Sequence, residues 1–248
     1  MGESALPLVA ATDAVAGQAV AAVLPVGSFE QHGSHLPFTT DTLVACTIAN
    51  AVAAAYGLLP LPPVTISCSH EHSHWRGTVS IKASTLYQVV NDIRDSLRTS
   101  GIEKLLIVGG HGGNYVLSNV VQEASVHGPD LAMFPTGQDW TDARKAAGLT
   151  ELDGWTDMHG GELETSLLLH AFPEAVRDSY TEADHVGDSR PNMLLTLGMP
   201  GYTTSGIIGR PAAATAAKGE ALLAALVDLA APHLGAIGAY SGSSPQTK

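Results

Sequence analysis

Histidine and carboxylate side chains gather directly after three apolar segments of this 248-residue chain. The apolar segment at residues 21–28 is followed by FEQHGSH, the segment at 60–69 by HEHSH, and the segment at 104–110 by HGGN. The first and third segments are typical of buried parallel strands, and the prolines of the second favour an extended chain. Loops at the carboxyl ends of parallel strands meet at one edge of the sheet. The spacing therefore predicts one polar site at that edge.

The loop after the first segment carries a mixed set of nitrogen and oxygen ligands. Glu30 and His32 are two residues apart, so in an extended segment their side chains point the same way. Asp41 begins the next predicted helix, where its carboxylate also complements the helix dipole. Each residue alone has a plain structural explanation, as a core or surface histidine or a first-turn helix acid. Together they suit Zn²⁺ or Mn²⁺ better than Ca²⁺, which prefers oxygen ligands, and they predict a metal site.

His111 lies within GGHGGN, and this setting indicates a further ligand for the same site. Glycines allow a close approach of the backbone, so the imidazole can press toward a metal. The alternative is a phosphate-binding loop. That alternative lacks the Lys-Ser/Thr of a P-loop and the glycine spacing of a dinucleotide fingerprint.

A third cluster, WTDMHGGELETS at residues 155–166, places His159 before a Gly-Gly turn and two glutamates after it. Glu162 and Glu164 should face different directions once they are helical. We expect one of them to reach the site and the other to orient a neighbour or cap the helix. Ordinary first-turn helix acids are the alternative for both.

The elements that position these residues alternate along the chain. Hydrophobic periodicity predicts strands at 21–28, 104–110 and 130–136, and helices at 41–56, 85–100, 114–127, 161–169 and 212–229. Residues 137–158 and 184–210 are expected to be loops, the first with about one helical turn. The alternation predicts an α/β fold with a mostly parallel sheet covered on both faces. We expect one domain over residues 1–240 and a flexible tail at 241–248.

Composition excludes several classes of protein. The chain carries 24 acidic against 12 basic residues, a net charge of −12, which argues against nucleic acid or an anionic membrane as a partner. With 45% hydrophobic and 15% charged residues, extensive disorder is excluded. No apolar run approaches 18 residues and no basic leader precedes one, so we expect a cytoplasmic protein.

Five segments resemble the creatininase family (creatinine amidohydrolases and relatives), in the same order and over nearly the whole chain. They are LPVGSFEQHGSHLPFTTDTLVA (24–45), RGTVSI (76–81), VGGHGGN (108–114), HGGELETS (159–166) and SGIIGRPAAATAAKG (205–219). The resemblance implies a three-layer αβα sandwich around a mostly parallel central sheet. It also implies a homo-oligomer, commonly a hexamer, and a centre of two divalent ions, Zn and/or Mn, with Fe as an alternative.

Carried over to this sequence, the resemblance assigns most of the ligands. Glu30 and His111 would bind one ion, His32 would bind the other, and Asp41 would bridge them. Creatininase takes a further carboxylate two residues after the histidine that corresponds to His111, and this chain has Gly113 there.

The glutamates of the third cluster are the candidates to replace that carboxylate. We expect Glu162 to do so, with Glu164 as the fallback. His159 corresponds to the active-site histidine of the family, which protonates the leaving nitrogen, and we assign catalytic roles to His159 and Glu164.

Other residues should form the substrate pocket. The expected lining residues are Ser69, Glu71, His72, Trp75, Gly112 and Trp155, with Arg76 as an alternative carboxylate contact. Family members usually carry Phe-Pro where this chain has Trp75-Arg76, and Thr156 replaces an acid. Together with Gly113, these departures argue against creatininase activity itself.

The resulting hypothesis is a metal-dependent amidohydrolase for a small cyclic amide, a formamide or a short peptide, acting through a metal-activated water without a Ser or Cys nucleophile. A mycofactocin-precursor peptidase and a formamide deformylase are the alternatives within the family. A non-catalytic metal-binding scaffold and a non-hydrolytic metal enzyme are the alternatives from other classes. A zinc nucleobase deaminase is excluded because the Pro-Cys-x-x-Cys half of its site is missing.

Overall fold

A four-stranded parallel sheet forms the centre of the protein, for which a computed structural model describes residues 5–149, 151, 153–187 and 190–242. The strands are β1 (Ala21–Val26), β2 (Leu59–Pro60), β3 (Lys104–Gly109) and β4 (Leu131–Phe134), in the spatial order β2-β1-β3-β4. β1 and β3 pair in register along their whole length, so both strands end at the same level. The loops that follow them therefore leave the sheet side by side.

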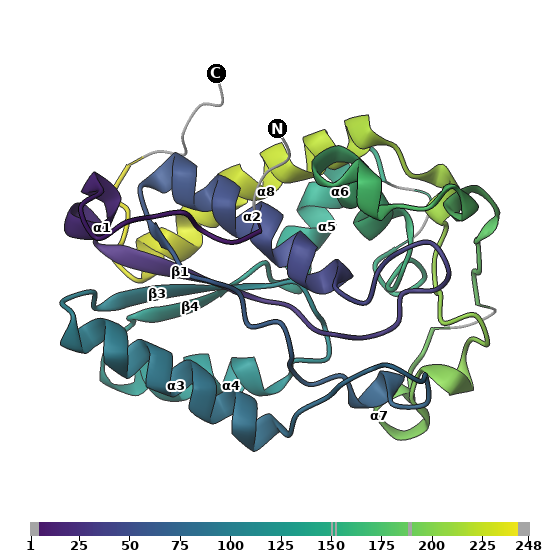
Figure 1. Cartoon of the computed structure of the whole chain (residues 1–248), viewed down its shortest axis with the longest axis horizontal. Helices are drawn as coiled ribbons and strands as arrows, with labels where there is room; N and C mark the ends of the chain where they lie inside the picture. Colours follow the sequence, from purple (N-terminus) through teal and green to yellow (C-terminus); the bar gives the residue numbers. More distant parts are fainter. Residues whose placement is uncertain (1–4, 150, 152, 188–189, 243–248) are drawn as a thin grey trace.

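Helices cover both faces of the sheet, as Figure 1 shows. One face is covered by α2 (Thr40–Tyr56), α5 (Gly137–Ala146), α6 (Glu162–Ala171) and α8 (Ala216–Ala236), and the other by α3 (Ala83–Thr99) and α4 (Val116–Ala124). Alternate strand residues enter two separate apolar cores: Val23 packs with the first group of helices and Leu24 with the second. All six residues of β1 are buried, which is why this strand is apolar throughout rather than alternating. The predicted three-layer αβα arrangement is confirmed.

Short elements complete the described chain. They are α1 (Ala14–Gln18), α7 (Leu194–Leu197) and the 3₁₀ turns η1 (His70–His72), η2 (Ser125–His127), η3 (Pro173–Ala175), η4 (Asp178–Glu182), η5 (Met199–Gly201) and η6 (Pro211–Ala213). Four of these, η4, α7, η5 and η6, lie in or next to the predicted loop 184–210. Among the described residues, no helix combines the length and the apolar character needed to cross a membrane.

The predicted loop at 137–158 is wrong over its first half, because residues 137–146 form α5. A capping box begins this helix: the Thr136 side chain accepts a hydrogen bond from the Asp139 backbone, and the Asp139 side chain accepts one from Thr136. Ala143 is buried, but most other residues of α5 are polar. The helix therefore has too narrow an apolar stripe to show in the periodicity. The sequence pattern Thr-x-x-Asp was the available signal.

The last helix also differs from the prediction. Thr215 caps it through its side chain, so α8 begins at Ala216 instead of 212 and continues past Pro232 to Ala236. In the predicted tail, Ser241 and Gly242 are exposed, and residues 243–248 lie outside the described part of the chain.

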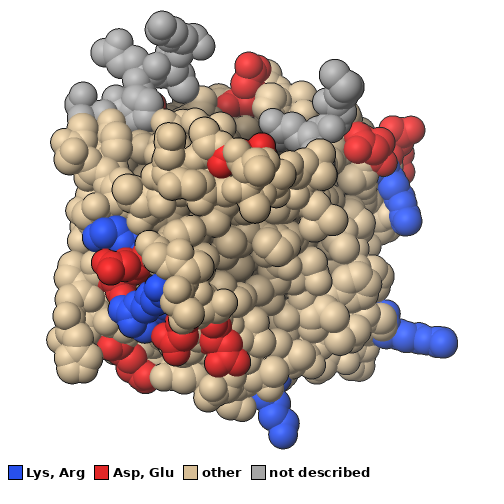
Figure 2. Space-filling model, turned by 60° about the vertical axis from the view of Figure 1, so that its left-hand side comes forward, with Lys and Arg blue, Asp and Glu red and all other residues tan. Residues whose placement is uncertain are grey.

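Charged side chains are sparse on the face that Figure 2 shows, and basic and acidic groups lie next to one another there. Much of this face is uncharged. On this face, the net negative charge of the chain is therefore not gathered into a patch of one sign.

Candidate metal centre

The loops after β1 and β3 and the first turn of α2 bring three predicted ligands together. One ligand atom from each of Glu30, Asp41 and His111 lies within 4.8 Å of the others. The Glu30 and Asp41 side chains are almost completely buried. This meeting follows from the register of β1 and β3, because both loops leave the same edge of the sheet.

Asp41 lies between two imidazoles. Its Oδ1 is 3.0 Å from His32 Nε2, and its Oδ2 is 3.2 Å from His111 Nδ1. Ser28 Oγ also donates a hydrogen bond to Asp41 Oδ2, at 2.6 Å. Burial would raise the pKa of Asp41, but the charges of His32 and His111 hold this pKa well below its usual range. Each carboxylate oxygen thus faces a different histidine, the arrangement that a bridging ligand needs.

Glu30 is the carboxylate of the cluster that lacks hydrogen-bond donors among the described residues. Both of its carboxylate oxygens are buried and accept no hydrogen bond from any described residue. Two histidine nitrogens lie near, His72 Nε2 at 3.1 Å from Oε1 and His111 Nε2 at 3.2 Å from Oε2, but without hydrogen-bond geometry. Burial raises the pKa of Glu30 to about 8. A buried carboxylate without donors is costly, and a bound cation would remove that cost. The residues present therefore fit a metal ion.

The pKa values of His32 and His111, the two histidines nearest Asp41, are also raised, but by neighbouring charges and not by burial. Burial would lower their pKa values, but the Asp41 charge raises that of His32 to about 9, and Glu30 and Asp41 raise that of His111 to about 10. Both shifts report a strongly negative potential at the centre. Protons and divalent cations compete for such a site, since a metal needs its histidine ligands deprotonated.

Two further groups of possible ligands adjoin the first. One consists of His32, His159 and Glu164, and the other of Glu30, His72 and His159. The His159 ring lies between those of His32 and His72, with ring centroids 4.1 and 4.3 Å away. Burial and the His32 charge hold the pKa of His159 well below its usual range, so this imidazole is neutral at neutral pH.

Only one of the two glutamates at the start of α6 faces the cluster. Glu164 Oε1 is 3.9 Å from His32 Nε2, and its Oε2 accepts a 2.6 Å hydrogen bond from the Gly160 backbone. Burial raises the pKa of Glu164 to about 7. Glu162 instead forms an ion pair with Lys218 on α8, and it belongs to none of the ligand groups found among the described residues. The glutamate that faces the cluster is therefore the fallback, Glu164, and the assignment of the last ligand stays a prediction.

His72 is the possible ligand that the sequence interpretation missed, since it was assigned only to the pocket. Burial and the charges of His32 and His111 lower the pKa of His72 to about 2, and a neutral imidazole can bind a metal. Its signal was its place in a His-rich run that directly follows an extended segment, as His32 follows β1.

A cavity of about 610 Å³ opens over the cluster. Of the six predicted pocket residues, Glu71, His72, Gly112 and Trp155 line it, whereas Ser69 and Trp75 do not. Ser69 is fully buried, and Trp75 packs against the small apolar core around Met199. The lining residues that sequence reasoning missed include Tyr115, Trp140, Arg144, Asp153, Met158 and Arg190.

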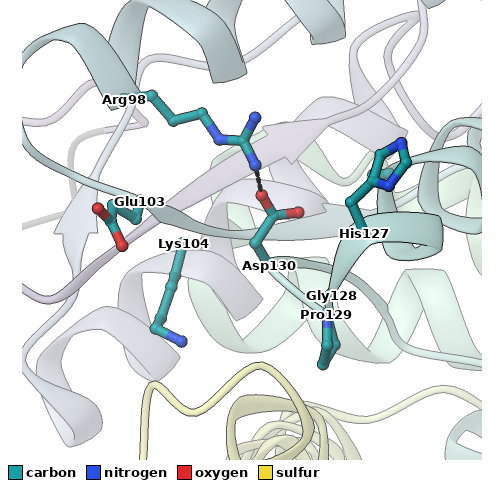
Figure 3. Close-up of a pocket in the computed structure, with 8 residues that line it drawn as sticks. Arg98, Glu103, Lys104, His127, Gly128, Pro129 and Asp130 are labelled. Atoms are coloured by element: carbon teal, nitrogen blue, oxygen red, sulfur yellow. Dashed lines mark hydrogen bonds and ion pairs between the residues drawn. The ribbon is translucent and has the colours of Figure 1, made fainter.

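A second cavity, of about 450 Å³, lies at the other end of the sheet. Figure 3 shows that Arg98 points toward Asp130 across it. The Arg94 guanidinium donates two hydrogen bonds of 2.8 Å to the same carboxylate. Lys104 Nζ donates to the Ile237 carbonyl oxygen. Arg98, Asp130 and Lys104 of this cavity thus have partners of opposite charge or polarity.

Comparison with known proteins places the chain among related hydrolases. The profile described as "Creatininase: Creatinine amidohydrolase" matches residues 9–234. The mycofactocin precursor peptide peptidase of Mycobacterium ulcerans (strain Agy99) is 33% identical over 221 residues, covering 83% of this chain and 81% of that protein. The creatinine amidohydrolase of Pseudomonas putida is 30% identical over 191 residues, covering 68% and 69%.

Solved creatininase structures are also similar to this chain. A creatininase mutant of the Zn-Zn type has a TM-score of 0.71 and 26% identity, covering 86% of this chain and 88% of its own. A creatininase with Mn has a TM-score of 0.72 and 25% identity, covering 86% and 89%.

Proposed function

Because the chain belongs to the creatininase family of hydrolases, we propose that it is a metal-dependent amidohydrolase that cleaves a C–N bond through an activated water. The buried carboxylate of Glu30 carries this proposal, since none of the described residues donates a hydrogen bond to it. Glu30 and His111 would hold one divalent ion, His32 and Glu164 would hold the other, and Asp41 would contact both. Zn²⁺ and Mn²⁺ both suit this mixture of histidines and carboxylates, with iron as the alternative.

The bound ions would supply Lewis acidity and would lower the pKa of a water to about 7. The task of the protein is then to move the proton from that water to the departing nitrogen. His159 suits this task, because its Nε2 donates a 2.7 Å hydrogen bond to the Gln31 carbonyl oxygen. The unprotonated Nδ1 is left 3.8 Å from Glu30 Oε1, at the cluster. His159 would accept the proton on Nδ1 as the water attacks the amide carbon, and would return it to the nitrogen as the C–N bond breaks.

A short peptide is the substrate class that the cavity supports best. A volume of about 610 Å³ falls within the range of pockets that bind drug-sized ligands, and it exceeds what a small cyclic amide fills. Aromatic and apolar residues supply much of the lining, with Tyr115, Trp140 and Trp155 among them. The 33% identity to a peptidase over 83% of the chain points the same way.

A formamide is the second candidate substrate. A deformylase of a formylamino-pyrimidine from Methanocaldococcus infernus is 29% identical to this chain, over 41% of the chain. Membership of the creatininase family also suggests that the protein is a homo-oligomer. Light scattering of the purified protein would test this.

Metal removal tests the proposed chemistry. We expect chelation to abolish release of amines from a panel of short peptides, formamides and creatinine, and Zn²⁺ or Mn²⁺ to restore it. Full activity in protein shown by elemental analysis to be metal-free would contradict the proposal.

The variant His159→Ala separates a hydrolase from a metal-binding scaffold. We expect it to keep its metal content while kcat falls by about 10²–10⁴-fold, the usual contribution of a proton-transferring group. Loss of metal together with turnover would instead identify His159 as a ligand. A wild-type protein that holds metal but hydrolyses nothing in the panel would favour the scaffold.

A further inference from the structure

We propose that Glu71 is a carboxylate ligand of the metal cluster, reaching it through the space that Gly113 leaves open. The inference rests on the proposed metal-dependent function and assigns to this residue a role beyond lining the pocket. Glu71 lies in η1, the 3₁₀ turn after the extended segment that ends at Ser69, next to the cluster residue His72. Its carboxylate thus comes from an element other than those that carry the predicted ligands.

The first support is the contact between Glu71 and His111. Glu71 Oε1 lies 3.5 Å from His111 Nε2, on the imidazole that also faces Glu30 and Asp41. The Glu71 side chain is 12% exposed, and it lines the cavity over the cluster. Among the described residues, the ion-pair partner of the Glu71 carboxylate is His111.

The second support is the fit between Glu71 and Gly113. A Cβ atom on Gly113 would lie 2.0 Å from Glu71 Oε1 and 2.9 Å from its Cδ, and 2.4 Å from His111 Nε2. Real contacts are never that short, so any other residue at position 113 would exclude the carboxylate from this place. Gly113 does not have a positive φ, so the backbone itself does not demand glycine there. The neighbouring Gly112 meets nothing within 4 Å, which locates the steric requirement at Gly113.

The third support is the charge balance of the loaded site. Glu30, Asp41 and Glu164 together carry three negative charges when ionised, against four positive charges on two divalent ions. A fourth carboxylate from Glu71 makes the buried centre neutral before any water loses a proton. Neutrality lowers the cost of burying these charges.

The test compares metal binding by the purified full chain with that of Glu71→Gln and of a control, Glu103→Gln. Glu103 is an exposed glutamate at the opposite end of the sheet. Zn²⁺ and Mn²⁺ per chain would be measured by elemental analysis after dialysis, and affinity by isothermal titration. The absorption spectrum of the Co²⁺-substituted protein would report the ligand set directly.

We expect Glu71→Gln to weaken binding of one ion at least about tenfold and to change the Co²⁺ spectrum. Tenfold is the lower end of the loss of metal affinity seen when a residue that only hydrogen-bonds to a ligand is replaced. Glu103→Gln should change neither. Equal stoichiometry, affinity and spectrum in Glu71→Gln and wild type would overturn the role of Glu71 and leave the proposed function standing. A wild-type protein that binds no metal would overturn both.

The double variant Glu71→Ala/Gly113→Glu moves the carboxylate from one position to the other. A side chain at position 113 no longer meets Glu71 in this variant, although the His111 ring, 2.4 Å from the new Cβ, must also turn aside. We expect the double variant to recover part of the metal that Glu71→Ala alone loses. A Glu71→Ala protein with wild-type metal content would contradict the proposal independently of the glutamine variant.

Discussion

Charged cavities lie at both ends of the sheet, and only one of them has the character of a site. At the amino end, Asp130 meets the guanidinium groups of Arg94 and Arg98, so its charge is compensated by the protein itself. At the carboxyl end, Glu30 is completely buried and accepts no hydrogen bond from the described residues. A cavity lined with charged side chains is therefore not sufficient to indicate a functional site. A buried carboxylate that the fold leaves without hydrogen-bond donors is what indicates a ligand.

The pKa values at the carboxyl end support the same distinction. Burial raises the pKa of Glu30 to about 8, while neighbouring carboxylates raise that of His111 to about 10. The amino-end carboxylate Asp130 lies between two arginines, which always stay charged, so its compensation does not depend on a bound ion. Substitutions at the carboxyl end should therefore change metal binding and activity, whereas those at the amino end should change only the free energy of unfolding, and by less.

The largest effect is expected from Asp41→Asn, because Asp41 faces both His32 and His111. We expect the protein to lose both ions and activity to fall by at least about 100-fold. This is the upper end of the loss seen when a residue that only hydrogen-bonds to a metal ligand is replaced. Elemental analysis and peptide hydrolysis would measure this. The control is Asp92→Asn on the exposed side of α3. Retention of two ions by Asp41→Asn would remove Asp41 as the bridge.

An intermediate effect is expected from Glu164→Gln, compared with Glu162→Gln on the same helix. The first should weaken binding of the ion held by His32 by about 10–100-fold. The second should leave metal binding unchanged. It should lower the Tm, because the Glu162 side chain is 5% exposed and its partner Lys218 would lose the opposing charge, and removing one charge of a buried pair is destabilising. If Glu162→Gln lost metal and Glu164→Gln kept it, Glu162 would be the ligand.

The smallest effect is expected at the other end of the sheet, from Arg98→Ala. Asp130 keeps Arg94 as a partner, and the Arg98 side chain is 44% exposed. The free energy of unfolding should therefore fall by about 1 kcal/mol or less. Calorimetry would measure the shift. Metal content and turnover should not change, and a change in either would break the contrast between the two ends.

Much of the site is predictable from sequence because it depends on local patterns. Glu30 and His32 follow one apolar strand and His111 follows another, and parallel strands deliver their loops to a common edge. The polar helix α5 is harder to predict, since its signal is a capping box instead of an apolar stripe. Its position on the sheet depends on buried contacts such as those of Ala143.

Periodicity and short-range spacing are enough to predict the alternation of strands and helices, the polar residues of the loops and the family resemblance. Which of Glu162 and Glu164 faces the cluster depends on tertiary structure, because the two side chains lie about 200° apart around a helix whose rotation is set by packing. Only the tertiary structure also brought Glu71 next to Gly113, 42 positions later in the sequence. The Glu71 carboxylate occupies the space that a side chain at position 113 would otherwise fill. Such a contact depends on tertiary packing, and no local sequence pattern predicts it.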